Sequence, residues 1–216
     1  PPQPEGFVYN ETHWCDDNPE TQQLDDAMIP ENRDFAYKLA KARSERMLYA
    51  RAESDGTFEA MSLLPIHVLG PLMCRNHDQP WSWQSSIRYM LAGKDYRKSP
   101  NGRMFWVITD VRDVARAHRL CAESTIARNG SRYLVSPEDR SGELRTWELQ
   151  AKLRELFPHV ATVGGEEMAG DKPAKYTPAW HAYCLLAKQE LGLRPYSIDD
   201  TLRATGDSYF RLGILP

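Results

Sequence analysis

The chain has 216 residues, of which 41% are hydrophobic, and this content supports one substantial core with room for a smaller second lobe. Its net charge is −3 and its basic residues alternate with acidic ones, so neither a nucleic-acid-binding surface nor an anionic-membrane surface is expected. No apolar run approaches the roughly 18 residues needed to span a bilayer, so no transmembrane segment is expected.

Four cysteines stand at long, irregular intervals, at positions 15, 74, 121 and 184. The sequence has neither the close C-x-x-C pairs of a zinc site nor the cysteine density of a disulfide scaffold. We therefore expect reduced thiols, no metal centre and a cytoplasmic location.

Prolines at positions 1, 2, 4, 19 and 30 predict a loop over residues 1–31. Because the chain opens on a proline-rich stretch without an initiator Met, we expect it to be part of a longer polypeptide. Helix-forming residues then predict a long helix from Asn32 to about Ser54, which Asp55-Gly56 terminates.

Two residues of this helix form a candidate acid–base pair. Tyr37 and Lys41 are four residues apart, so they lie one turn apart on the same helix face. An unperturbed phenol, with a pKa of about 10, is a poor acid–base catalyst at neutral pH, and a neighbouring cation stabilises the phenolate. The same spacing also arises by chance, so it does not by itself distinguish a catalytic pair from two surface residues. Other segments of the sequence are needed to separate these interpretations.

The segment after the helix predicts a strand that enters a sheet. Residues 57–64 alternate toward a wholly apolar end, Pro65 terminates them, and residues 66–72 form an apolar, turn-rich stretch that predicts a loop. Open α/β sheets hold ligands at the carboxyl ends of their parallel strands, so this loop is a candidate binding segment.

Further along the chain, strands and helices alternate, which predicts an α/β fold. Asp110 is expected to cap a helix, and Gly192 and Gly213 to end two others. Tryptophans 81 and 83 and Tyr89 either line an apolar pocket or pack against the main body. Strands are predicted at 104–109 and 131–135, helices at 80–93, 111–124, 146–157, 182–191 and 198–211, and a surface excursion at 159–178.

Several segments, in the same order over nearly the whole chain, resemble one family. The most specific are residues 37–41 (YKLAK), 64–71 (LPIHVLGP) and 109–118 (TDVRDVARAH), with weaker support from 8–14 (VYNETHW) and 191–202. The chain is similar to the extended short-chain dehydrogenases/reductases of the NAD-dependent epimerase/dehydratase superfamily. Within them it resembles the group of dihydroflavonol reductase, cinnamoyl-CoA reductase and aldehyde reductase.

The resemblance implies the C-terminal part of a Rossmann-type doubly wound parallel sheet plus a smaller mixed α/β substrate-binding lobe. It implies hydride transfer between NADP or NAD, with NADP favoured, and a small carbonyl or alcohol substrate. Tyr37 would be the general acid or base, and Lys41 would support it and bind the nicotinamide ribose. Pro65 and Val68 would border the nicotinamide ring, and His67 stands where the family usually has a small residue.

The resemblance also implies two regions and a missing part. Residues 1–71 would be the portion of the Rossmann core with the catalytic helix and the nicotinamide loop, and residues 72–216 mainly the substrate-binding lobe, with returning core elements near 103–136. The family's Gly-rich turn, G-x-x-G-x-x-G, does not occur in residues 1–216, and its catalytic Ser or Thr is expected before residue 1. We expect the N-terminal half on the same enzyme or on a separate chain, and these 216 residues alone to be inactive.

Two other functions stay open. One is a reductase-like structural subunit of a larger assembly that no longer catalyses a reaction, and the other is a nucleotide-sugar epimerase, which shares the Tyr-Lys pair. The aromatic-rich stretch from 81 to 106 favours an apolar or aromatic carbonyl substrate.

Overall fold

The computed structural model describes residues 6–15, 33–80, 82–96, 104–166 and 181–216. Helices and strands alternate along these ranges, which confirms the predicted α/β class. The elements are β1 (Val8–Tyr9), α2 (Arg33–Asp55), β2 (Ser62–Pro65), β3 (His67–Leu69), α3 (Trp83–Leu91), β4 (Phe105–Asp110), α4 (Val111–Glu123), β5 (Arg132–Val135), β6 (Glu143–Arg145), α5 (Thr146–Leu156), β7 (His181–Ala182), α6 (Leu185–Leu191) and α7 (Ile198–Arg211).

Parallel pairing dominates the strands of the described chain. β1 pairs with β7, β2 with β5 and β3 with β4, all in parallel, and β6 joins β4 in antiparallel orientation. Pro65 at the end of β2 lies opposite Val135 of β5, and Val68 of β3 lies opposite Thr109 of β4. The stretch from β2 to β3 therefore changes partner, from β5 to β4, at Ile66.

The prediction of a loop over residues 66–72 was wrong for its first part, because 67–69 form β3. Pro65 does end β2, as expected of a residue without a backbone N–H. Pairing resumes two residues later because β4 offers a second parallel partner. Because β4 is about 40 residues away in sequence, the residues around Ile66 carry no local pattern that predicts this pairing.

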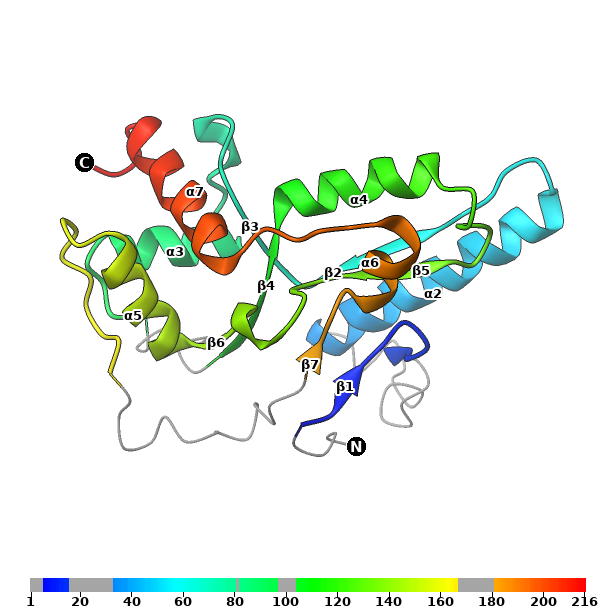
Figure 1. Ribbon diagram of the computed structural model, residues 1–216, viewed down its shortest axis with the longest axis horizontal. Coiled ribbons are helices and arrows are strands. Elements are labelled where there is room, and N and C mark those ends of the chain that lie inside the picture. The colour runs from blue at the N-terminus through cyan, green and yellow to red at the C-terminus, as the bar shows by residue number, and fades with distance from the viewer. Residues whose placement is uncertain (1–5, 16–32, 81, 97–103, 167–180) are drawn as a thin grey trace.

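The described strands form three small sheets, β1–β7, β2–β5 and β3–β4–β6, and helices lie on both sides of the strands (Figure 1). α2 lies on one side of the β2–β5 pair and α4 on the other, while α3, α5 and α7 gather around β3, β4 and β6. Buried side chains form two clusters, one between α4, α6 and β5 and a larger one among α3, α5, α7 and the β3–β4 pair. The expected division of the chain between residues 71 and 72 stays a prediction.

Most predicted helix ends are confirmed. The Asp110 side chain accepts a hydrogen bond from the amide of Arg112 at 2.7 Å and so caps α4. Gly192 ends α6 in the left-handed conformation, at φ 68°, and Gly213 follows α7 at φ 60°. α6 begins at Leu185, not at residue 182, because residues 181–182 pair with β1 as β7.

Other predicted boundaries differ by a few residues. The strand expected at 57–64 begins only at Ser62, and the helix expected at 80–93 spans 83–91. β1 and β6 were not predicted. Position 81, most of the predicted N-terminal loop and residues 167–178 of the predicted excursion lie outside the described residues.

None of the described helices is long and apolar enough to cross a membrane. The four cysteines are free thiols; Cys121 and Cys184 are buried, whereas Cys74 is exposed. Within the described ranges, no group of three or more His, Cys, Asp and Glu side chains is placed to hold a metal ion.

Candidate active site

Tyr37 and Lys41 both lie on the solvent-facing side of α2. Leu39 and Ala42, from the same two turns, are only 6% and 7% exposed, whereas Tyr37 is 67% exposed and Lys41 is also exposed. The helix therefore buries one face and presents the phenol and the ammonium on the other. Both groups are accessible to a ligand, as a catalytic pair must be.

A partly buried ion pair attaches α2 to Arg132, the first residue of β5. The Arg132 guanidinium lies 2.8 Å from Glu45 Oε1, with the two side chains 11% and 12% exposed. The Tyr49 hydroxyl donates to the same carboxylate oxygen at 2.8 Å, and the side-chain amide of Asn129 donates to the Tyr49 carbonyl at 3.3 Å. These contacts fix the direction in which the helix presents its exposed face.

The N-terminal segment 7–15 contacts both α2 and β5. The Trp14 ring lies against two guanidinium groups, with its centroid 4.0 Å from Arg46 Cζ and 3.7 Å from Arg132 Cζ. The Cys15 thiol donates to the Lys38 carbonyl at 3.1 Å. This segment therefore contacts the turn of α2 that carries Tyr37.

The two other predicted site residues lie at the carboxyl edge of the parallel strands. Pro65 is exposed at the end of β2, and Val68 is half-buried in β3. Thr109 holds this edge together, because its hydroxyl donates to the Val135 carbonyl at 2.7 Å and accepts from the Ile66 amide at 3.3 Å. Among the described residues, no hydrogen bond or ion pair joins the side chains of Tyr37 and Lys41 to this edge.

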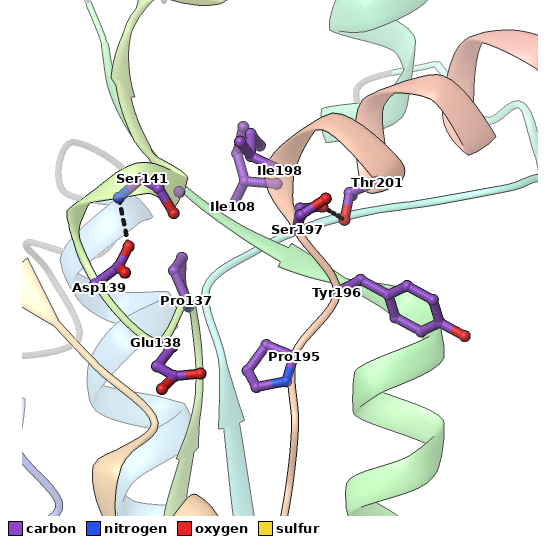
Figure 2. A pocket seen from close by; sticks show the side chains of 11 residues that line it. Ile108, Pro137, Glu138, Asp139, Ser141, Pro195, Tyr196, Ser197, Ile198 and Thr201 are labelled. Atoms are coloured by element: carbon purple, nitrogen blue, oxygen red, sulfur yellow. Dashed lines mark hydrogen bonds between the residues drawn. The ribbon is translucent and has the colours of Figure 1, made fainter.

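A pocket of about 220 Å³ opens just past the carboxyl end of β5. Figure 2 shows the loop around Pro137 on one side of it, the Pro195–Ile198 segment on the other and Ile108 of β4 between them. The Tyr196 ring points away from that loop, and Arg112 of α4 stacks on it at 3.7 Å. The pocket follows directly on Val135, the partner of Pro65, so it belongs to the same edge of the sheet.

Tryptophans and a histidine form an aromatic wall where β3 meets the lobe of α3, α5 and α7. The His67 ring centroid lies 4.7 Å from that of Trp83 and 5.5 Å from that of Trp106. Trp106 is fully buried and Trp83 is half-buried against the larger cluster, whereas Tyr89 is exposed. Burial lowers the pKa of His67 to about 4, so its imidazole is neutral at physiological pH.

Sequence reasoning missed a buried polar cluster that joins β6 to β7. His181 Nδ1 lies 2.7 Å from Glu143 Oε2, and the Arg140 guanidinium lies 2.9 Å from His181 Nε2. Burial raises the pKa of the Glu143 carboxyl, although the hydrogen bond with His181 opposes this. The partners are 38 residues apart and carry no motif, so only the fold reveals them.

The Gly164-Gly165 pair is not a dinucleotide-binding turn. Both residues have positive φ, and a Cβ at Gly164 would lie 2.6 Å from the Gln150 side chain. At Gly165 a Cβ would lie 2.9 Å from the Ala151 amide nitrogen. The pair therefore packs closely against α5, and the element directly before it is this helix, whereas a phosphate-binding turn directly follows a strand.

Comparisons with known proteins agree with this architecture. The model of the NAD dependent epimerase/dehydratase family matches residues 4–135. No curated protein sequence matches the chain.

Solved reductases and an epimerase have similar folds. Yeast methylglyoxal/isovaleraldehyde reductase Gre2, solved with NADPH, matches with a TM-score of 0.74 at 20% identity, over 98% of this chain and 60% of that one. Alfalfa (Medicago sativa) vestitone reductase matches with 0.70 at 18% identity, over 97% and 60%. UDP-glucose 4-epimerase of Thermotoga maritima, solved with UDP-glucose, matches with 0.62 at 21% identity, over 83% and 54%.

The chain thus spans 60% or less of the length of these three structures. At these identities the likeness establishes the fold. It confirms the expected fold class, a partial Rossmann-type α/β domain.

Proposed function

This chain belongs to the NAD dependent epimerase/dehydratase family, and on that premise we propose that it carries the acid–base half of an NAD(P)-dependent carbonyl reductase or alcohol dehydrogenase. We assign it to the group of dihydroflavonol, cinnamoyl-CoA and aldehyde reductases, as their C-terminal portion. The observation that carries the proposal is the exposed Tyr37–Lys41 pair on a helix whose other face is buried.

In this proposal each site residue has one task. The Tyr37 hydroxyl protonates the carbonyl oxygen of the substrate, or deprotonates the alcohol in the reverse direction. The Lys41 ammonium stabilises the tyrosinate and binds the nicotinamide ribose. Pro65 and Val68 border the nicotinamide ring, since both lie at the carboxyl edge of the parallel strands, where β2 ends and β3 begins. When bound, the cofactor supplies or takes up the hydride.

The residues of this chain fit the nicotinamide end of the cofactor only. A pyrophosphate cradle needs closely spaced backbone amides at a helix N-terminus, and the sequence contains no G-x-x-G-x-x-G turn. We therefore propose that the cradle and the Ser or Thr partner of Tyr37 come from polypeptide outside these 216 residues, on the same enzyme or on a separate chain. Within the described chain β2 pairs only with β5, so its other edge can accept such a segment.

Support for NADP as the cofactor comes from fold relatives. The yeast enzyme and Gre2 of Candida albicans were both solved with NADPH. We propose a cytoplasmic site of action because Cys15, Cys74, Cys121 and Cys184 are free thiols.

Cofactor uptake and turnover by the natural full-length polypeptide test the proposal. We expect NADPH binding, seen as a change in nicotinamide fluorescence, and carbonyl-dependent oxidation of NADPH at 340 nm with aromatic ketones. Lys41→Met should weaken NADPH binding and lower kcat, while Lys94→Met, at an exposed position just past the C-terminal end of α3, should leave both unchanged. Absence of NADPH and NADH binding would refute the enzymatic assignment and favour a structural subunit.

A nucleotide-sugar epimerase is the second candidate, because an epimerase solved with UDP-glucose shares the fold. The two activities differ in their redox balance. A reductase consumes one NADPH per turnover, whereas an epimerase returns its cofactor unchanged. Interconversion of UDP-glucose and UDP-galactose without net cofactor oxidation would therefore replace the reductase assignment.

A further inference from the structure

The buried cluster of Glu143, His181 and Arg140 fixes the protonation state of its histidine. His181 Nδ1 lies 2.7 Å from Glu143 Oε2, and the Arg140 guanidinium lies 2.9 Å from His181 Nε2. A guanidinium donates hydrogen bonds and accepts none, so His181 Nε2 is the acceptor and carries no proton. The ring is therefore neutral, with its proton on Nδ1, where it is donated to the Glu143 carboxylate.

A second proton on this ring would conflict with Arg140. It can bind only at Nε2, the atom that accepts the hydrogen bond of Arg140. Two N–H groups would then face each other, and both side chains would be cations at close range. Protonation of His181 and the Arg140–His181 hydrogen bond therefore exclude each other.

The Glu143 carboxylate determines which of the two cations stays. Glu143 Oε2 lies 2.7 Å from His181 Nδ1 and 4.0 Å from Arg140 Nε. The side chains of Glu143 and His181 are 2% and 6% exposed, whereas that of Arg140 is 73% exposed. A protonated His181 keeps a short ion pair shielded from water, and Arg140 loses little by turning into solvent. The second proton thus displaces the arginine and leaves the histidine in place.

The other groups described around His181 do not change charge in the pH range in which imidazoles titrate. The Tyr183 ring lies parallel to the imidazole, at 5.9 Å between centroids, and burial raises the pKa of its phenol. Asp139 is exposed, and its hydrogen bonds with Ser141 lower the pKa of its carboxyl. On β1, the residue opposite His181 is the uncharged Val8.

Arg140 belongs to the turn of residues 139–142, which lines one side of the pocket (Figure 2). The stretch before this turn is held separately, because the Pro137 carbonyl accepts a hydrogen bond from the Cys184 amide at 3.3 Å. Within the described residues, the hydrogen bond from Arg140 to His181 is the side-chain hydrogen bond that joins the turn itself to β7. Loss of this bond leaves the turn attached through its two ends.

We propose that His181 is a pH-sensitive switch: its neutral ring holds the turn of residues 139–142 against β7, and a proton on Nε2 releases Arg140 and loosens that side of the pocket. The switch goes beyond the proposed reductase function and does not depend on it. The turn is held at high pH and released at low pH, because the released state binds one more proton than the held state.

Spectra of the ¹⁵N-histidine-labelled natural full-length polypeptide test the protonation step. At about pH 8, long-range ¹H–¹⁵N spectra should show His181 protonated at Nδ1 and not at Nε2. Between about pH 8 and pH 5, where imidazoles titrate, Nε2 should gain a proton while the Glu143 carboxyl carbon keeps the chemical shift of a carboxylate. A proton on Nε2 already at pH 8, or a proton that binds Glu143 instead of Nε2, would overturn the proposal.

Amide hydrogen exchange in the same polypeptide reports the release of the turn. The Ser141 amide donates to Asp139 Oδ1 at 2.8 Å, and the Glu143 amide donates to the Arg140 carbonyl, so both depend on the closed turn. After correction for the intrinsic pH dependence of exchange, their protection should fall about tenfold as Nε2 becomes protonated. Protection that stays constant through the Nε2 titration would show that the turn does not respond to His181.

Variants separate His181 from other titrating groups. The amide of His181→Gln can accept from Arg140 and donate to Glu143 but does not titrate, so it should keep the turn protected at both pH values. Arg140→Ala should give the low protection at both. His118→Gln, at an exposed position on α4, should retain the pH dependence of the unmodified protein. Persistence of that dependence in His181→Gln would refute the switch.

Discussion

At the scale of single residues, Thr109 of β4 contacts both β5 and the junction between β2 and β3 through one hydroxyl group. Its Oγ1 donates to the β5 carbonyl of Val135 and accepts from the amide of Ile66, between β2 and β3. Thr109 itself belongs to β4 and is almost fully buried. Polar groups in such a position depend on each other, because water cannot replace a lost partner.

Replacement of Thr109 by the isosteric valine should therefore destabilise the fold. We expect the free energy of unfolding to fall by about 2 kcal/mol, since a buried carbonyl and an amide lose their partner while volume is conserved. Urea unfolding monitored by circular dichroism measures the change. Thr125→Val, at an exposed position, should change stability by less than about 0.5 kcal/mol; equal effects of the two substitutions would contradict the role of Thr109.

His67 makes stability depend on pH in a defined direction. Its pKa is lowered from 6.5 to about 4 by burial, so between these values the unfolded chain binds a proton that the folded chain does not. Stability contributed by the neutral ring is present above pH 6.5 and is lost as the pH falls toward 4. The contribution amounts to about 3 kcal/mol across this window.

Urea unfolding at pH 7 and at pH 4.5 checks this, for the unmodified protein and for His67→Gln. From pH 7 to pH 4.5, the free energy of unfolding of the unmodified protein should fall further than that of the variant, which has no titrating group at this position. The difference should be the larger part of the His67 contribution. Parallel loss in both proteins would show that other groups cause the pH dependence.

The sequence located some of these residues and not others. Tyr37 and Lys41 were found from their spacing, because helix periodicity alone puts them on one face. Their exposure is consistent with a site, although the catalytic role stays a prediction. Thr109 and the Glu143–His181 pair could not be found this way, since their partners come from distant strands.

At the scale of elements, the position of α2 depends on contacts with β5. The ion pair between Arg132 and Glu45 is largely shielded from water, and the Tyr49 hydroxyl shares the same carboxylate. Removal of one partner from such a pair leaves the other charge poorly solvated. The exposed pair Arg119–Glu123 on α4, at 62% and 58% exposure, offers a matched comparison.

Glu45→Ala should lower the free energy of unfolding by about 2 to 3 kcal/mol, because the Arg132 guanidinium loses its counter-ion in a partly buried setting. Glu123→Ala should cost less than about 0.5 kcal/mol, since an exposed pair is well solvated without its partner. Chemical denaturation of both variants in the same buffer measures the difference. If Glu123→Ala costs as much as Glu45→Ala, burial does not strengthen the attachment of α2.

Elements with local signals were predicted well, and those created by pairing were not. α4 and α7 were placed nearly to the residue, because Asp110 and Ser197 cap them and amphipathic spacing fills them. β3 and β7 were missed, since three and two residues acquire strand geometry only from β4 and β1. The antiparallel β6 is likewise defined by its partner β4.

At the scale of the whole molecule, the chain combines a parallel sheet with a helical lobe. The candidate groups lie on two different parts of it, Tyr37 and Lys41 on α2 and Pro65 with Val68 at the carboxyl edge. This arrangement belongs to the fold that the chain shares with its family. The proposed reduction of a carbonyl group would use both parts.

The kcat of Tyr37→Phe, measured on the natural full-length polypeptide with NADPH and an aryl ketone, tests this account most directly. We predict a loss of at least about 100-fold, because phenylalanine keeps the ring and removes the proton donor. Tyr89→Phe is the matched control, since Tyr89 on α3 is also exposed and its ring centroid lies 5.3 Å from the Lys94 ammonium. It should retain activity within twofold. A Tyr37→Phe enzyme as active as the Tyr89→Phe enzyme would contradict the catalytic role of the pair.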